Sequence, residues 1–229
     1  MTARLHFADA GEAADLAAFL ARLIHYDKAA AVRLQAAGDT LAVFGRPPSF
    51  EVLAIRTARL AKPYEDGLDT TLDVTVSAGE LLESVAESAE SVQTAGVADV
   101  PEAVTGPPWA GVLPPRGGWR QEPGLPAPEA VRGLVAAAVA EFKARVEELP
   151  QERRVRAELD RVGREIWSRT IGETGLPVRV AHAAQGLGFL RGDALTLLSS
   201  GAWLRLRTAY GSVAVRRAAG VGGLSLTPT

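Results

Sequence analysis

The 229-residue chain contains no cysteine. This absence excludes disulfides, thiolate catalysis and cysteine-ligated metals, so noncovalent packing must supply the stability. No apolar run is long enough to span a bilayer, because residues 135–140 are followed at once by Glu141 and Lys143. The first six residues also lack the apolar core of a signal peptide. We therefore expect a cytoplasmic protein that has no membrane segment.

Lysine is scarce, since 22 of the 25 basic residues are arginine. Arginine has a planar, forked set of donors that lysine lacks, and selection for that geometry is one explanation of the bias. The many alanines favour a simpler interpretation, which is codon pressure in a GC-rich bacterial genome.

Common catalytic motifs are missing. There is no phosphate-binding Gly-x-x-x-x-Gly-Lys loop, no Gly-x-Ser-x-Gly nucleophile turn and no His-Glu-x-x-His zinc motif. The glycines of residues 186–192 mimic a dinucleotide-binding loop, but the last one comes a residue late and the loop follows a predicted helix. We therefore predict no catalytic residue and no cofactor, and we expect that the protein is not an enzyme.

Metal-ligand patterns are absent as well. His6, His25 and His182 are scattered along the chain, and we interpret His182 as a hydrogen-bonded packing residue instead of a base. A predicted helix carries carboxylates three and four residues apart from Glu80 to Glu90. The serines beside them favour a hydrated polar face over a cation site, so we predict no bound metal.

The net charge of −2 conceals two poles of opposite sign. Residues 1–100 carry a net charge of −7 and residues 177–229 a net charge of +5, and the residues between them sum to zero. Such poles predict that the two ends face each other or face neighbouring copies in an oligomer. Two separate hydrated surfaces are an equal alternative.

The predicted fold class is α+β, with an N-terminal helix plus antiparallel sheet, a central helical pair, and a C-terminal helix with antiparallel hairpin strands. Residues 1–96 form the first predicted domain. Its first helix begins after a capping signal at Asp9, and a turn signal at Gly38 joins two strands into a hairpin. Its other predicted elements are strands over 50–60 and 72–76, a helix from Ser77 toward Gly96, and a short strand over Arg4–Phe7.

This order of elements, with the strand that enters a helix over Asp73–Leu82, resembles half of one domain of a DNA sliding clamp. The resemblance implies a fold and covers less than half of the chain. A clamp lines its channel with basic helices, whereas the second predicted helix here carries Glu80, Glu83 and Glu87. Any function that the resemblance implies is analogy.

Residues 97–126 contain seven of the fourteen prolines. This density predicts a Pro/Gly-rich strap or linker without regular elements. Trp109 and Trp119 are costly to leave in water, so we expect an ordered strap whose indoles dock on a neighbouring surface.

Residues 127–220 are predicted to form a helical pair followed by a small antiparallel sheet, and residues 221–229 a flexible tail. Helical apolar spacing runs from Val131 to Leu149 and again from Val155 to Thr170, and Pro150 should lie in the first turn of the second helix. The second helix is rich in arginine, but four pairs of opposite charges stand four residues apart, which favours a self-neutralised face over a nucleic-acid surface. The predicted pairs are Glu152–Arg156, Arg154–Glu158, Asp160–Arg164 and Arg161–Glu165.

The C-terminal part is predicted to begin with a short helix after Pro177 and to continue as strands over 194–198, 203–208 and 212–217. Gly211 supplies the turn of a hairpin between the last two strands. Leu204, Leu206, Val213 and Val215 fall on one face of this hairpin, and Trp203, Arg205, Arg207, Ala214 and Arg216 fall on the other. An indole among guanidinium groups on an uncovered sheet face is the most distinctive predicted surface.

Three functional hypotheses follow. The first is a non-catalytic interaction or assembly protein that self-associates, with a second copy or another protein as partner. Its candidate interaction residues are Trp203, Arg205, Arg207, Arg216, Trp109 and Trp119, because tryptophan and arginine are frequent interface anchors. The second is a nucleic-acid-associated module that uses the hairpin. A separate, purely structural alternative for the hairpin is that it lies under the strap, with its arginines paired with the acidic N-terminal half. The third is a small-ligand binder or an unrecognised enzyme.

Overall fold

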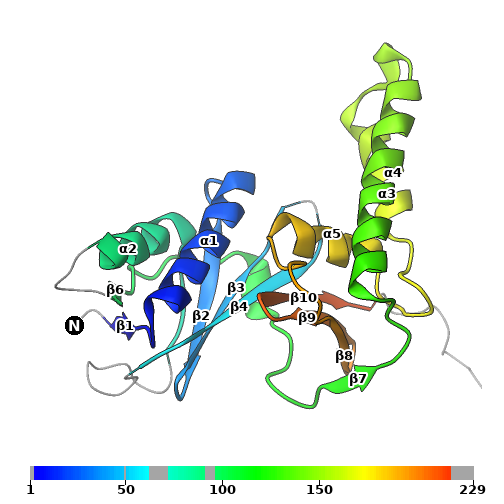
Figure 1. Ribbon diagram of the computed structural model, residues 1–229. Coiled ribbons are helices and arrows are strands. Elements are labelled where there is room, and N and C mark those ends of the chain that lie inside the picture. Colours follow the sequence, from blue (N-terminus) through cyan, green and yellow to red (C-terminus); the bar gives the residue numbers. More distant parts are fainter. Residues whose placement is uncertain (1–2, 49, 62–71, 91–95, 218–229) are drawn as a thin grey trace, which may run out of the picture.

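The computed structural model of the protein describes residues 3–48, 50–61, 72–90 and 96–217. It confirms the predicted α+β class, with five α-helices, an eight-stranded antiparallel sheet and a two-stranded sheet in these ranges (Figure 1). The elements are β1 (Arg4–His6), α1 (Ala10–Tyr26), β2 (Ala31–Ala37), β3 (Thr40–Gly45), β4 (Leu53–Arg59), β5 (Asp73–Ser77), α2 (Ala78–Glu90), β6 (Val97–Asp99), β7 (Arg120–Glu122), α3 (Pro128–Glu148), α4 (Arg156–Trp167), α5 (Val178–Gly186), β8 (Thr196–Ser200), β9 (Trp203–Thr208) and β10 (Gly211–Arg216).

The large sheet joins two three-stranded meanders side by side. Its order is β5-β2-β3-β4-β10-β9-β8-β7, so the meanders β2-β3-β4 and β8-β9-β10 meet where β4 pairs with β10. Helix α1 packs on β4 and helix α5 packs on β10, which puts both helices on the same face of the sheet (Figure 1). We call this the helix face and the opposite side the open face.

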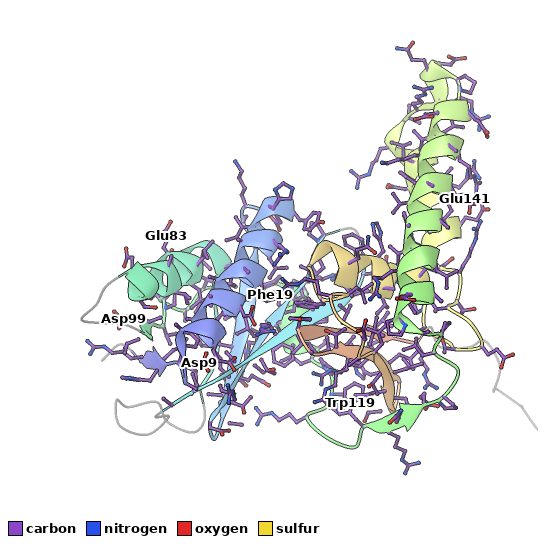
Figure 2. The ribbon with its side chains drawn as sticks, in the orientation of Figure 1. Asp9, Phe19, Glu83, Asp99, Trp119 and Glu141 are labelled. Carbon is purple, nitrogen blue, oxygen red and sulfur yellow. The ribbon has the colours of Figure 1, made fainter. Side chains whose placement is uncertain are left out.

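The core lies between the helices and the helix face. Asp9 caps α1 by accepting a hydrogen bond from the Glu12 amide, and Leu16, Phe19, Leu20 and Leu23 form its buried stripe. Phe19 points from α1 into this layer and stacks on Phe189, which follows α5, at 5.7 Å between ring centroids (Figure 2). One apolar cluster therefore runs beneath both helices.

The predicted helical pair forms a projecting arm, in which α3 and α4 lie side by side and extend away from the sheet (Figure 1). Only its base is packed against the body, where Val131, Val135 and Ile166 are buried. The predicted stripe on α3 is wrong at Leu134, which is 42% exposed, because no described element covers that side.

The predicted position of Pro150 is also wrong. Leu149 has ψ 134°, the extended geometry that a following proline favours, and this ends α3. A short 3-10 turn over Gln151–Arg153 follows, and α4 begins only at Arg156.

Three short elements interrupt the segment predicted to lack regular structure: β6, a 3-10 turn over Pro108–Gly111, and β7. Several predictions lie outside the described residues, namely the polar turn over 62–69, the last turn of the second helix and the tail over 221–229. No helix in the described ranges is long and apolar enough to cross a bilayer.

Candidate interaction site

The C-terminal hairpin has the predicted strands and the predicted division of side chains. Strands β9 and β10 pair antiparallel, with Trp203 opposite Arg216 at one end and Thr208 opposite Gly211 at the other. Leu204, Leu206, Val213 and Val215 are buried on the helix face. Glycine is required at 211 because φ is +149° and a Cβ there would lie 2.6 Å from the Phe189 ring.

The open face of this hairpin is partly covered, contrary to the prediction of an uncovered face. Ala214 is fully buried in a second apolar cluster with Phe44, Leu53 and Ile55. Trp109, held by the 3-10 turn of the strap, packs against this cluster together with Leu113 and Trp203. The strap therefore passes over the junction of the two meanders.

Trp119 holds Arg205 in a second contact between strap and hairpin. The Arg205 guanidinium carbon lies 5.6 Å from the centroid of the Trp119 ring, and Nε donates a hydrogen bond to Ser212 Oγ at 2.7 Å. Burial, with a smaller contribution from the charge of Arg207, lowers the pKa of Arg205. Trp119 is itself held because its Nε1 donates to the carbonyl oxygen of Pro115, and Figure 2 shows it on the side of the sheet away from α5. Arg205 is thus occupied within the chain.

A cavity of about 410 Å³ lies beside the Trp109 contact, and we call it the strap cavity. Its aromatic walls are Trp109 and Trp203, and the guanidinium carbon of Arg216 lies 6.0 Å from the Trp203 ring centroid. Its other charged lining residues are Arg46, Arg179 and Glu51. The structure thus brings three of the six predicted interaction residues to one cavity, places Trp119 and Arg205 in a separate stack, and leaves Arg207 exposed.

Sequence reasoning missed Arg46, Arg179 and Glu51. Arg179 is the second residue of α5, Arg46 follows β3, and Glu51 precedes β4, so their convergence depends on how distant elements pack. Glu51 is the one non-glycine residue with positive φ in the described ranges, at +50°. A charged residue before a strand carries no sequence signal of that conformation.

The hairpin lies partly under the strap, as one interpretation predicted, but its arginines form no ion pair with a described residue of the acidic N-terminal half. Arg205 contacts Ser212 and Trp119, and Arg207 and Arg216 form no ion pair with a described residue. Carboxylates of the N-terminal half pair with arginines of that same half. Asp73 pairs with Arg33 at 2.6 Å, and Asp15 pairs with Arg56 at 2.7 Å.

His182 lies among aromatic rings on α5. It stacks on Trp167 at 4.3 Å and meets Phe50 edge-on at 5.1 Å. These ring contacts agree with the prediction that His182 is a packing residue. Its Nδ1 is buried and has no hydrogen-bond partner among the described groups, so this nitrogen does not make the predicted hydrogen bond. Burial lowers the pKa of His182, which keeps the ring neutral.

Charges on the arm are neutralised within the chain, as predicted, but by different partners. Arg145 forms a two-pronged ion pair with Glu165, and Arg169 forms one with Glu141, so α3 and α4 are connected across their interface. Within α4 the observed pairs are Arg156–Asp160 and Arg161–Glu158. None of the four predicted pairs is present in this fully described segment. Glu165 is taken by Arg145 across the helices, whereas Glu158 and Asp160 pair with other nearby arginines, and residues 152 and 154 lie before α4 begins.

The acidic face of α2 is exposed. Glu80, Glu83 and Glu87 are exposed, and the described residues contain no group of three or more histidines and carboxylates that could hold a metal ion.

Comparison with known proteins gives matches over nearly the whole chain. The chain matches two family models, "Domain of unknown function (DUF8010)" over residues 1–111 and "Domain of unknown function (DUF8185)" over residues 114–220, so the two models meet within the strap. No curated protein matches. A solved structure that the chain is similar to is the DNA polymerase sliding clamp from Pseudomonas aeruginosa, with a TM-score of 0.49 and 13% sequence identity. That match covers 95% of this chain, which spans 65% of the length of the clamp chain.

Proposed function

We propose that this chain is a non-catalytic interaction protein that assembles with copies of itself through oppositely charged surfaces. The observation that carries the proposal is the contrast between the arm and the rest of the surface. On the arm, Arg145 and Arg169 pair with acids across the two helices, although Glu147 and Glu148 are exposed and form no ion pair with a described residue. On α2 and on the hairpin, exposed charges of opposite sign are separated and form no ion pair with described residues.

The two surfaces are complementary in sign. The α2 surface consists of Glu80, Glu83 and Glu87, and the hairpin surface has Arg207 at its centre. They belong to the parts of the chain that carry net charges of −7 and +5. Because the two patches differ, contact between them is head-to-tail, and head-to-tail contacts build rings or filaments.

The test is sedimentation velocity over a range of protein concentrations and salt concentrations. We expect association that weakens as salt rises, because exposed charges are screened within about 10 Å at 0.1 M salt. The triple variant Glu80→Gln, Glu83→Gln, Glu87→Gln should weaken association about fivefold or more, since each exposed pair contributes roughly 0.2–1 kcal/mol.

A matched control is the double variant Glu147→Gln, Glu148→Gln, which removes exposed charges from the arm and should leave association unchanged. Charge reversal gives a sharper test: Glu83→Arg and Arg207→Glu should each weaken self-association and should associate with each other when mixed. A monomer at every concentration and salt would refute the proposal.

Nucleic-acid binding through the hairpin is the second candidate, and the exposed Arg207 beside the Trp203–Arg216 contact favours it. Because Arg205 is occupied by Trp119 and Ser212, the informative variant is Arg207→Ala with Arg216→Ala. Fluorescence anisotropy with a labelled single-stranded oligonucleotide at low salt should show binding that this variant loses. If the parent protein does not bind, this candidate is wrong.

A further inference from the structure

Arg179 is a partly buried cation that no described residue satisfies. Its Nε is buried without a hydrogen-bond partner, and the guanidinium forms no ion pair or hydrogen bond with a described residue. Arg56 differs, because although its Nε is also buried without a partner, its other two nitrogens donate to the carbonyl oxygen of Tyr210 and to Asp15. A buried N–H donor without a partner is unfavourable, so the Nε of Arg179 calls for a hydrogen-bond acceptor, and an anion suits its positive charge.

Arg179 stands where two cavities meet. It lines the strap cavity, and with Glu51 it also lines a second cavity of about 760 Å³ at the base of the arm, beside Trp167 and Phe142. Of the other two arginines of the strap cavity, neither Arg46 nor Arg216 forms an ion pair with a described residue. The strap cavity thus has three uncompensated cations and one acid among its lining residues.

The same cavity offers flat aromatic surfaces. Trp109 comes from the strap and Trp203 from β9, and both are only partly buried, so ring surface remains accessible. The volume of about 410 Å³ lies in the range of small-molecule sites, which is about 300–1,000 Å³. Indole faces favour a planar ring and guanidinium groups favour phosphate, so the lining selects a ligand that has both.

Glu51 adds a polar group at the shared wall of the two cavities. It holds φ at +50°, a conformation that is unfavourable for a residue with a side chain and that is enriched at binding sites. Its carboxylate can accept hydrogen bonds from ring nitrogens or sugar hydroxyls, which phosphate-binding arginines cannot do.

We propose that the strap cavity binds a nucleoside phosphate, with the base against Trp109 and Trp203 and the phosphate on Arg179 and Arg216. The ligand is a free nucleotide or the phosphorylated end of a single strand, since both present a base beside a terminal phosphate. This site is independent of the charged surfaces proposed for assembly, because neither the α2 glutamates nor Arg207 lines the cavity.

The test is titration of the full chain with adenosine and guanosine monophosphates, followed by intrinsic tryptophan fluorescence and by calorimetry. We expect saturable binding with quenching of fluorescence. Arg179→Gln and Arg216→Gln should each weaken binding about tenfold or more, because each removes a charge-assisted hydrogen bond. Trp203→Leu should weaken it about fivefold or more by removing a stacking surface.

Arg207→Gln is the matched control, since Arg207 lies on the same strand and the same face as Trp203 but outside the cavity. It should change nucleotide affinity less than twofold. Arg216 is exposed at the end of β10, so its variant tests the proposal even if Arg179→Gln impairs folding. Hydrogen exchange of the unmodified protein should show protection of the 106–112 segment on nucleotide addition.

Two probes separate the ligand sources and the competing explanations. The first probe is a 5′-phosphorylated oligonucleotide. If it binds more tightly than both the mononucleotide and the same oligonucleotide without its phosphate, the ligand is a strand end. If the mononucleotide binds equally well, the ligand is the free nucleotide. Inorganic phosphate that competes as well as the nucleotide would overturn recognition of the base. No binding of any nucleotide, or binding that Arg179→Gln and Arg216→Gln leave unchanged, would overturn the site.

Discussion

The two halves of the large sheet follow one plan and differ in what is added to it. In the N-terminal half, α1 precedes the meander β2-β3-β4 and β5 forms the edge strand; in the C-terminal half, α5 precedes the meander β8-β9-β10 and β7 forms the edge strand. Each meander buries one face under one helix, α1 with 17 residues and α5 with 9. The arm is inserted in the C-terminal half between β7 and α5. A meander thus needs one covering helix, and the connection to that helix tolerates a long insertion.

The open faces of the halves differ more than the helix faces. In the N-terminal half the polar residues are satisfied within the sheet, where Arg33 pairs with Asp73 and also donates to Thr75. In the C-terminal half Arg207 and Arg216 are exposed and unpaired within the described chain. Within the described residues, the exposed and unpaired arginines of the sheet's open face therefore lie in the C-terminal half.

The largest expected loss of stability comes from removing the Phe19 ring, which joins the N-terminal and C-terminal halves of the core through its stack on Phe189. Phe19→Ala should lower the free energy of unfolding by about 3–5 kcal/mol, because the ring is fully buried and stacks on Phe189. Phe142→Ala, at a half-buried ring of the arm, should cost about 1–2 kcal/mol. Urea unfolding measures both, and equal losses would contradict the view that the arm contributes little to the core.

A smaller loss is expected from Arg56→Ala. Arg56 lies on β4, is 8% exposed, and connects α1 through Asp15 with the β9–β10 turn through Tyr210. Its removal should cost about 3 kcal/mol. Arg59→Ala is the matched control on the same strand, and its exposed pairs with Asp9 and Glu12 should matter much less. A loss for Arg59→Ala as large as that for Arg56→Ala would show that the junction has no special role.

The close contact between the C-terminal hairpin and Phe189, which follows α5, can be tested at Gly211. Gly211→Ala should destabilise by about 2 kcal/mol, because the added methyl group meets the Phe189 ring. Gly201→Ala also places a residue at positive φ, but open space surrounds it, so only about 1 kcal/mol of backbone strain is expected. Thermal and urea unfolding of the two variants should rank them in this order, and the reverse order would be inconsistent with this packing.

The smallest effect concerns the arm. A hydrogen bond from Arg169 lowers the pKa of Glu141, and one from Arg145 lowers the pKa of Glu165. Because these values are lower in the folded state, the ion pairs stabilise the protein above the ordinary pKa of glutamate and are lost as pH falls through the folded values. Arg169→Gln should raise the pKa of Glu141 toward its ordinary value and leave that of Glu165 lowered by Arg145. Carboxyl titration by NMR measures this, and an unchanged Glu141 would show that the cross-helix pair is not formed in solution.

Local patterns predicted most of the elements correctly. The capping signal at Asp9, the Gly38 turn and the alternation from Trp203 to Arg216 depend on neighbours in the chain, and the helix and both hairpins are where these signals predict them. The candidate site was predicted only in part. Trp109, Trp203 and Arg216 were singled out, whereas Arg179 sits in a short helix with no sequence feature that separates it from other arginines.

The sequence by itself determined the α+β class, the starts of α1, α2 and α5, and the inward and outward sides of the C-terminal hairpin, because each follows from periodicity and turn chemistry within a few residues. The tertiary structure alone decided that β4 pairs with β10, that the strap covers Ala214, and which guanidinium groups remain without a partner. Those outcomes depend on contacts between segments far apart in the chain, and neither spacing nor composition specifies which distant surfaces meet.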